Sequence, residues 1–273
     1  MSKWRWVLAS PWMVAFICFF SISAQADTLK IDTGSAVDEQ GAVHLTLTLE
    51  NTGATPLRHV HPMFHFHHSS SMLPPVAALA PGERVTMETN DHPPVVRHGR
   101  YPVAAMVHYR DENGEERTAL HTDSFHYREP AVSEIVGEIQ AARVGEDSLL
   151  RVILKNHSAS LKNIQMMLLV PPELIVENFK GMMGLTLRGG EVKQFEVPVK
   201  RAPGSRDGDY PVHLTVEYGE MLTHFTGEIK AKVRVGSLWV SLAPHAAAVV
   251  LLVLFTFFLY RRSRGPEAAA AGG

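Results

Sequence analysis

Residues 99–109, Gly-Arg-Tyr-Pro-Val-Ala-Ala-Met-Val-His-Tyr, decide the fold, because their pattern returns as Gly-Asp-Tyr-Pro-Val-His-Leu-Thr-Val-Glu-Tyr at residues 208–218. Every second residue of the first stretch, including Tyr101, Val103 and Val107, is apolar or aromatic. This alternation is typical of a β-strand with one buried face. The repetition predicts that the same kind of strand occurs twice in the chain.

Two further blocks of sequence repeat in the same order. Residues 45–51, Leu-Thr-Leu-Thr-Leu-Glu-Asn, correspond to residues 150–156, Leu-Arg-Val-Ile-Leu-Lys-Asn. Residues 79–83, Leu-Ala-Pro-Gly-Glu, correspond to residues 187–191, Leu-Arg-Gly-Gly-Glu. Because the three blocks are offset by 105 to 109 residues, we infer two copies of one domain of immunoglobulin size.

The predicted fold class is all-β. Turn signals such as Pro81-Gly82 and Asn113-Gly114 separate the strands, and helical periodicity is not evident before the C-terminal apolar segment. We predict two tandem immunoglobulin-like antiparallel β-sandwiches followed by one transmembrane helix. The first repeat is placed at residues 27–130 and the second repeat at residues 131–236.

The three repeated blocks resemble those of the CARDB-like, cell-adhesion-related β-sandwich domains of bacterial and archaeal envelope proteins. The shared features are the strand that ends in Asn, the Leu-x-x-Gly-Glu turn and the Gly-x-Tyr-Pro-Val strand start. The resemblance covers most of residues 27–236. It implies a binding, spacer or adhesion module, because these motifs build a scaffold and carry no chemistry of their own.

Both ends of the chain have the pattern of targeting segments. Residues 1–26 combine a positive start, an apolar centre and the small-x-small cleavage site of a signal peptide. Residues 237–260 are long enough to cross a bilayer, and the arginines of the short tail, 261–273, are expected to stay in the cytoplasm. We therefore predict a single-pass protein of the cell membrane whose two domains are periplasmic or extracellular.

Composition excludes several classes of function. The chain has 273 residues and a net charge of -2, which gives no electrostatic footprint for nucleic acid. The sequence contains no Gly-x-Ser-x-Gly elbow, Walker A loop or Gly-x-Gly-x-x-Gly loop. We predict that the protein is not an enzyme and has no obligatory cofactor.

The histidines distinguish the two repeats. The first repeat holds 11 of the 15 histidines, with 8 Lys+Arg against 14 Asp+Glu, whereas the second holds three histidines, with 13 Lys+Arg against 13 Asp+Glu. If residues 58–68 form a strand, Val60, Phe64 and Phe66 face the core and the alternate residues face outward. In an immunoglobulin-like arrangement this strand neighbours residues 101–110.

A transition-metal site is one interpretation of this outward face. The only cysteine, Cys18, lies in the predicted signal peptide, so the mature protein offers imidazole and thioether groups without a thiolate. That donor set suits copper in either oxidation state, and imidazole alone suits zinc or nickel. The candidate metal ligands are His59, His61, Met63, His65, His67, Met106 and His108.

Two further interpretations of the histidine face stay open: a solvated polar surface, whose charge would change with pH, and a surface for partner recognition. The predicted function is a membrane-anchored, extracytoplasmic, non-catalytic binding or assembly module. It would present its tandem domains to an envelope protein or a polysaccharide. The alternative is a protein that binds or delivers a transition metal, copper before zinc, through the histidine and methionine face.

Overall fold

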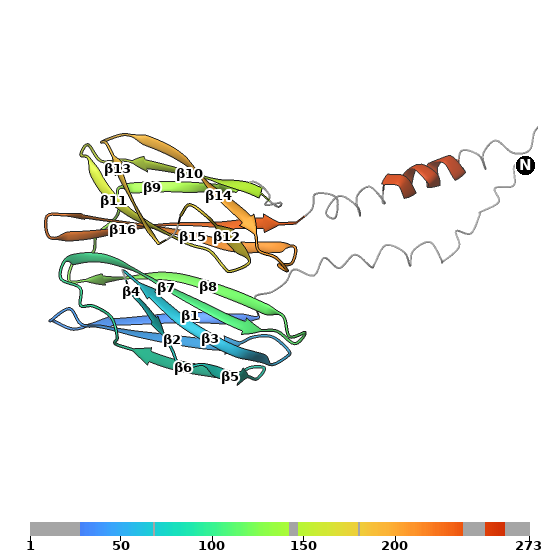
Figure 1. The fold of residues 1–273 in the computed structure, drawn as a ribbon, viewed down its shortest axis with the longest axis horizontal. Helices are drawn as coiled ribbons and strands as arrows, with labels where there is room; N and C mark the ends of the chain where they lie inside the picture. Colours follow the sequence, from blue (N-terminus) through green and yellow to red (C-terminus); the bar gives the residue numbers. More distant parts are fainter. Residues whose placement is uncertain (1–27, 68, 142–146, 180, 237–248, 260–273) are drawn as a thin grey trace, which may run out of the picture.

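The computed structural model describes residues 28–67, 69–141, 147–179, 181–236 and 249–259, and within these ranges the protein is built mainly of β-strands (Figure 1). The first repeat contains β1 (Leu29–Val37), β2 (Val43–Asn51), β3 (Leu57–Phe66), β4 (Ser69–Met72), β5 (Val76–Leu79), β6 (Arg84–Thr89), β7 (His98–Arg110) and β8 (Glu116–Tyr127). The second contains β9 (Ile135–Ala141), β10 (Asp147–Asn156), β11 (Lys162–Leu169), β12 (Leu174–Val176), β13 (Met182–Leu187), β14 (Val192–Arg201), β15 (Gly208–Glu220) and β16 (Thr223–Val235). The predicted all-β class is confirmed.

Each repeat is an immunoglobulin-like sandwich of two sheets. In the first repeat, the sheet β1-β2-β6 faces the sheet built from β3, β4, β5, β7 and β8. In the second repeat, β12-β14-β10-β9 faces β13-β11-β15-β16. The leucines of the repeated strand, such as Leu47 in β2 and Leu154 in β10, are completely buried in the two cores. The alternating pattern of the sequence therefore specifies the inward faces correctly.

The repeated Asn closes the end of its strand in both domains. Asn51 is completely buried, and its side-chain amide donates to the carbonyl oxygens of Thr55 and Leu79, each at 2.8 Å. Asn156 does the same in the second repeat, where its amide donates to the carbonyls of Ser160, at 2.8 Å, and Leu187, at 3.3 Å. In both repeats this Asn therefore satisfies backbone groups that would otherwise be buried without a partner.

The other two repeated blocks also have structural roles. The carboxylate of Glu83 accepts from the backbone N–H of Ala80 at 2.7 Å and so fixes the turn before β6. The hydroxyl of Tyr101 donates to the carbonyl of Arg97 at 2.8 Å, and Tyr210 bonds in the same way four residues upstream, at 3.0 Å. These are tyrosine corners of the kind found in immunoglobulin-like domains. The repeated motifs thus build the scaffold.

The two sandwiches are joined through their sheets. The start of β16 pairs in parallel with the start of β7, with Thr223 opposite His98 and His224 opposite Gly99 (Figure 1). Gly99 has a φ of 130°, and a Cβ at this position would lie 2.0 Å from the carbonyl oxygen of His224. Only glycine allows the two backbones to approach this closely. Pairing at this corner continues one nine-stranded sheet across both repeats.

Away from that corner, the outward faces of the two sheets cover each other. Ala104 and Met106 of β7 point away from the first core, yet they are only 2% and 8% exposed. His213 and Thr215 of β15 point away from the second core and are 9% and 2% exposed. Each face is therefore shielded by the other repeat.

Polar contacts hold these covered faces together. The ammonium of Lys230 donates to the carbonyl of Thr122 at 3.0 Å, and Arg100 forms an ion pair with Glu228 at 3.3 Å. A third link, at the edge of the interface, is the ion pair of Arg206 with Glu115. We conclude that the two repeats form one body with a polar interface.

One helix is described, at 249–259, and none in the described part of the chain is long and apolar enough to span a membrane. The predicted span at 237–260 is described only over these residues. The predicted signal peptide, 1–26, and the predicted tail, 261–273, lie outside the described residues.

Candidate functional site

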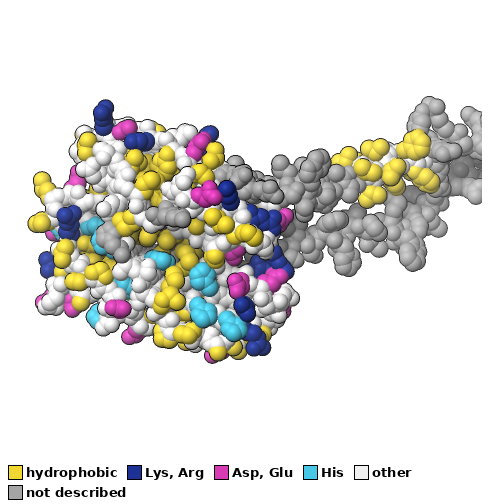
Figure 2. Space-filling view, viewed as in Figure 1, with side chains coloured by type: hydrophobic (Ala, Val, Ile, Leu, Met, Phe, Trp, Pro, Cys, Tyr) yellow, Lys and Arg dark blue, Asp and Glu magenta, His cyan; other side chains and the backbone are white. Residues whose placement is uncertain are grey.

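The histidine-rich strand β3 has the orientation that its sequence predicts. Val60, Phe64 and Phe66 are completely buried in the first core, whereas His61 and His65 are turned to the other side of the sheet. β3 pairs antiparallel with β7, as expected for the two corresponding strands of an immunoglobulin-like sandwich. In the space-filling view, histidine side chains gather mainly on the half of the molecule formed by the first repeat (Figure 2).

Strand pairing arranges the outward residues in rows. His61 lies directly opposite His108. Met63 lies opposite Met106 on one side and Met72 of β4 on the other. Residues that are directly opposite share a face, with their Cβ atoms about 4.5–5.5 Å apart. A pair of imidazoles therefore lies beside a row of three thioethers, and Met72 is a member that the sequence analysis missed.

Two of the predicted ligands leave this arrangement. His59 lies at a β-bulge between Arg58 and His61, with a φ of 50°, so the strand makes an extra step there. His67 lies beyond the end of β3, with a φ of 51°, in a two-residue connection in which Phe66 is opposite Ser69. Tight hairpins of this length require positive φ values. His67 is therefore directed away from the row that contains His61 and His65.

Burial favours the neutral form of two imidazoles on this face, those of His108 and His65. The pKa of His108 is lowered mainly by burial and further by the neighbouring His61. The pKa of His65 is lowered mainly by burial and further by His108. Each ring also has a hydroxyl partner 3.0 Å from its Nδ1, Thr118 for His108 and Ser70 for His65. Neutral imidazole is the form that binds metal ions, and it is also the form that accepts hydrogen bonds.

A cleft between the repeats gives access to part of this face. It has a volume of about 610 Å³, and His59, His61 and His108 line it from the first repeat. From the second repeat, Glu173 and Arg206 line it, together with the turn at residues 202–205. Clefts between domains are common binding sites.

Glu173 is the most unusual group of the cleft. Its Oε2 is buried and has no hydrogen-bond partner within the described residues. Burial raises the pKa of its carboxyl group, and a hydrogen bond from its own backbone together with the nearby Arg117 offsets only part of this effect. The shift favours the protonated form of the carboxyl group, and it is this form that can donate a hydrogen bond to a ligand.

The second repeat also changes the prediction for Met106. The sequence analysis places this methionine on an outward face, and the structure covers that part of the face with the second repeat, leaving Met106 8% exposed. Of the seven predicted ligands, His59, His61 and His108 reach the cleft, and Met63 and Met106 lie beside them. His65 shares the outward face but does not line the cleft, and His67 belongs to another group of residues.

That other group joins the two repeats. His67 of the first repeat and His224 of the second both contact Glu217, whose Oε2 is 2.8 Å from His67 Nδ1 and 3.2 Å from His224 Nε2. One ligand atom from each of the three residues lies within 4.8 Å of the others, and the described residues contain no second such group of His, Cys, Asp or Glu. The sequence analysis missed Glu217 and His224, because no spacing along one strand connects them with His67.

Glu217 is held as a carboxylate. Burial alone would raise its pKa, but the hydrogen bonds from His224 and His67 outweigh burial and lower the pKa to about 2. The ring of Tyr101 stacks on His224, with centroids 4.2 Å apart and planes at 2°. The Nδ1 of His224 lies 2.6 Å from the carbonyl oxygen of Arg100. These contacts fix both the position and the orientation of the His224 ring.

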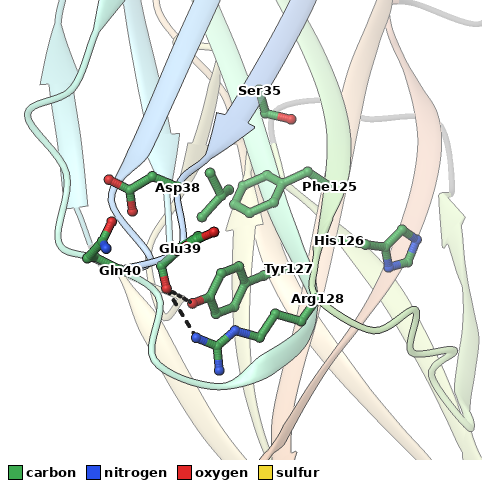
Figure 3. Close-up of a pocket in the computed structure, with 9 residues that line it drawn as sticks. Ser35, Asp38, Glu39, Gln40, Phe125, His126, Tyr127 and Arg128 are labelled. Atoms are coloured by element: carbon green, nitrogen blue, oxygen red, sulfur yellow. Dashed lines mark hydrogen bonds between the residues drawn. The ribbon is translucent and has the colours of Figure 1, made fainter.

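A second hollow, of about 540 Å³, lies at the opposite edge of the first repeat, where the turn after β1 meets the end of β8 (Figure 3). The hydroxyl of Tyr127 and the guanidinium of Arg128 both donate to the carbonyl of Glu39, each at 3.1 Å. His126 points away from these groups (Figure 3). The contacts tie a turn to a strand and form no ligand set.

No protein-family model and no curated protein matches the chain. Among solved structures, it is similar to part of native alpha-2-macroglobulin from Escherichia coli, with 16% identity and a TM-score of 0.34 over 38% of this chain and 17% of that chain. Trypsin-activated alpha-2-macroglobulin from Escherichia coli gives 11% identity and a TM-score of 0.32 over 77% and 18%. The PapD-like domain 7 of human CEP192 gives 14% identity and a TM-score of 0.25 over 38% and 87%. The chain thus spans less than a fifth of these macroglobulin chains, and similarities this low carry no functional information.

Proposed function

We propose that this protein is a membrane-anchored, extracytoplasmic, non-catalytic binding module that presents two joined immunoglobulin-like domains to an envelope protein or a polysaccharide. The observation that carries the proposal is the cleft between the repeats, with walls from both domains. Because the repeats share a covered polar interface, they offer a partner one fixed surface. A preorganised surface costs less ordering entropy on binding than two independent domains would.

The roles of the repeated motifs support a binding module of the CARDB-like type. Asn51, Glu83 and Tyr101 all bond to the backbone of their own repeat, so the motifs that the two repeats share serve the scaffold. The side chains that differ between the repeats, such as the histidines, are available for recognition of a partner.

The anchoring part of the proposal is supported by residues 249–259. Their side chains are apolar except for Thr256, and the large apolar ones are exposed. The hydroxyl of Thr256 donates to the carbonyl of Leu252 within the helix, at 2.9 Å, so it leaves no polar group unsatisfied. Together with the arginines that follow in the sequence, this pattern favours a membrane anchor with a cytoplasmic tail.

The recognition proposal is tested by blocking the cleft. The full chain, purified in detergent, is assayed for binding to isolated envelope polysaccharide and to solubilised envelope proteins. Pro203→Arg, at the wall of the cleft, is expected to weaken binding at least tenfold. Val192→Arg is the matched control, because Val192 is already 58% exposed on β14. Equal affinities for the two variants would rule out the cleft as the binding surface.

A second candidate function is transition-metal binding or delivery by the first repeat. It is favoured by the pairing of His61 with His108 next to Met63 and Met106, a soft donor set that suits copper. The substitutions His61→Ala and His108→Ala are expected to remove copper binding by the full chain, measured by titration with Cu(I) and Cu(II). Partner binding that persists after chelation would favour the recognition module, whereas its loss would favour the metal function.

A further inference from the structure

The contact of His67, Glu217 and His224 lies at the corner where the two repeats meet. The Glu217 and His224 side chains are 5% and 7% exposed, and the His67 side chain is 27% exposed. Both imidazoles approach the same carboxylate oxygen, Glu217 Oε2. Burying a carboxylate is costly unless a positive charge or strong hydrogen bonds compensate. The two imidazoles, or an ion bound between them and the carboxylate, have to supply this compensation.

The proton on His224 is determined by its backbone neighbour. The carbonyl oxygen of Arg100, 2.6 Å from Nδ1, can only accept a hydrogen bond, so Nδ1 carries the proton. In a neutral ring, Nε2 then presents its lone pair to the carboxylate oxygen of Glu217, 3.2 Å away. Two acceptors facing each other at this distance repel. This repulsion is removed by a proton shared between the two atoms or by a metal ion bound to both.

We propose that His67, Glu217 and His224 form a site for a divalent transition-metal ion of the zinc type, shared by the two repeats. Two imidazole nitrogens and one carboxylate oxygen are a donor set that zinc takes in proteins, with a fourth position left for water. Ligand atoms about 2.0–2.1 Å from a tetrahedral zinc lie about 3.3 Å from one another. The two distances to Glu217 Oε2, 2.8 and 3.2 Å, are close to that spacing, and the two ring nitrogens lie within 4.8 Å of each other.

The surroundings of His224 match those of a metal ligand. Histidines that bind metals usually donate their other N–H to a carbonyl or carboxylate, which fixes the tautomer. The carbonyl of Arg100 has this role for His224, and it also accepts from the hydroxyl of Thr226 at 2.9 Å. Tyr101 stacks on the ring and limits its rotation. Calcium and magnesium are excluded as occupants, because they prefer an all-oxygen set.

The site depends on both repeats and is separate from the cleft. His67 reaches it because the turn after β3 takes the chain out of the strand. His224 reaches it because Gly99 lets β16 approach β7. A bound ion would thus link a turn of the first repeat to two strands of the second. The inference does not rest on partner binding, and either one can fail without the other.

Zinc binding by the purified full chain tests the proposal. After removal of metal with a chelator, Zn²⁺ is titrated in competition with a chromogenic chelator. We expect one equivalent of tightly bound zinc. Glu217→Gln, which preserves the shape of the side chain, and His67→Ala, at the partly exposed turn, are each expected to weaken binding at least about 100-fold. His44→Ala and His157→Ala, which remove exposed histidines outside this group and outside the cleft, are controls that keep the wild-type affinity.

A measurement on the wild-type protein covers the case in which a variant does not fold. Zinc X-ray absorption spectra of the loaded full chain are expected to show two imidazoles and oxygen ligands at about 2.0 Å. Spectra with one imidazole or none would overturn the site. Unchanged zinc affinity in Glu217→Gln would do the same, as would zinc binding that is lost in His61→Ala and His108→Ala but kept in His67→Ala. Zinc affinity no better than about 100 µM would show that a shared proton, and not a metal ion, lies beside Glu217.

Discussion

Substitution of Gly99 by Ala tests the corner that joins the two repeats. The backbone of Gly99 has a φ of 130°, which side chains rarely adopt, and the added Cβ would lie 2.0 Å from the carbonyl oxygen of His224. The obstacle is backbone, so it cannot move aside as a flexible side chain could. The substitution must push β7 and β16 apart at the point where they pair.

The loss of stability expected for Gly99→Ala follows from these two effects, the backbone strain and the steric clash. Forcing an alanine into this backbone region costs about 1–3 kcal/mol. Inserting a methyl group into a filled contact costs about 1–3 kcal/mol more. The repeat supplies a control at the equivalent glycine, because a Cβ on Gly208 would have no neighbour closer than 3.8 Å and its φ is ordinary. Gly208→Ala should change stability by no more than about 1 kcal/mol.

Urea unfolding of the full chain, followed by circular dichroism, compares the two alanine variants. Because two domains can unfold in separate steps, amide hydrogen exchange locates the damage. Gly99→Ala should speed exchange at residues 98–100 and 223–225, whereas Gly208→Ala should not. The inferred close contact of the repeats would be contradicted if the two variants lost the same free energy of unfolding. Slow exchange at the corner in Gly99→Ala would contradict it as well.

Three further predictions concern the scaffold and the interface. Asn156→Ala should destabilise the second repeat by about 1–3 kcal/mol, since it leaves buried carbonyls without donors, and unchanged urea unfolding would contradict this. Tyr101→Phe should cost about 0.5–1.5 kcal/mol in the same assay, the usual contribution of the one hydrogen bond that it removes. The pKa of His213 is lowered from 6.5 to about 4, mainly by burial and further by Lys230, so the unfolded chain binds the extra proton between these pH values. The contribution of neutral His213 to the free energy of unfolding should therefore be fully present above pH 6.5. It should decrease by up to about 3 kcal/mol as the pH drops to 4. His213→Gln should remove most of that slope, and an unchanged slope would refute the assignment.

The sequence contains most of what specifies each sandwich. Alternation along 99–109 and 208–218 identifies β7 and β15, and the burial of Phe64 and Phe66 follows from their spacing in β3. Cross-strand neighbours were also predictable, because the immunoglobulin-like order places β3 beside β7. These features depend on local period and on a shared fold, and both are visible in a single chain.

Features that arise where segments distant in sequence meet could not be predicted. The bulge at His59 and the turn at His67 break the strict period of two, and neither contains glycine, the usual signal of positive φ. Glu217 and His224 approach His67 only after the repeats have packed together. Nothing in the spacing of either repeat indicates which face the other will cover.

The interface changes what the comparison of the two repeats means. Glu217 stands where the first repeat has His108, and Thr215 stands where it has Met106. In the second repeat these two residues are only 4% and 2% exposed, because they cover the first repeat. The two faces are therefore complementary halves of one interface. The lack of histidines on the face of the second repeat consequently does not show that the first repeat could fold and pack without its own. A ligand that reaches His61 and His108 enters through the cleft between the repeats, so its affinity must respond to Gly99→Ala even though Gly99 does not line the cleft.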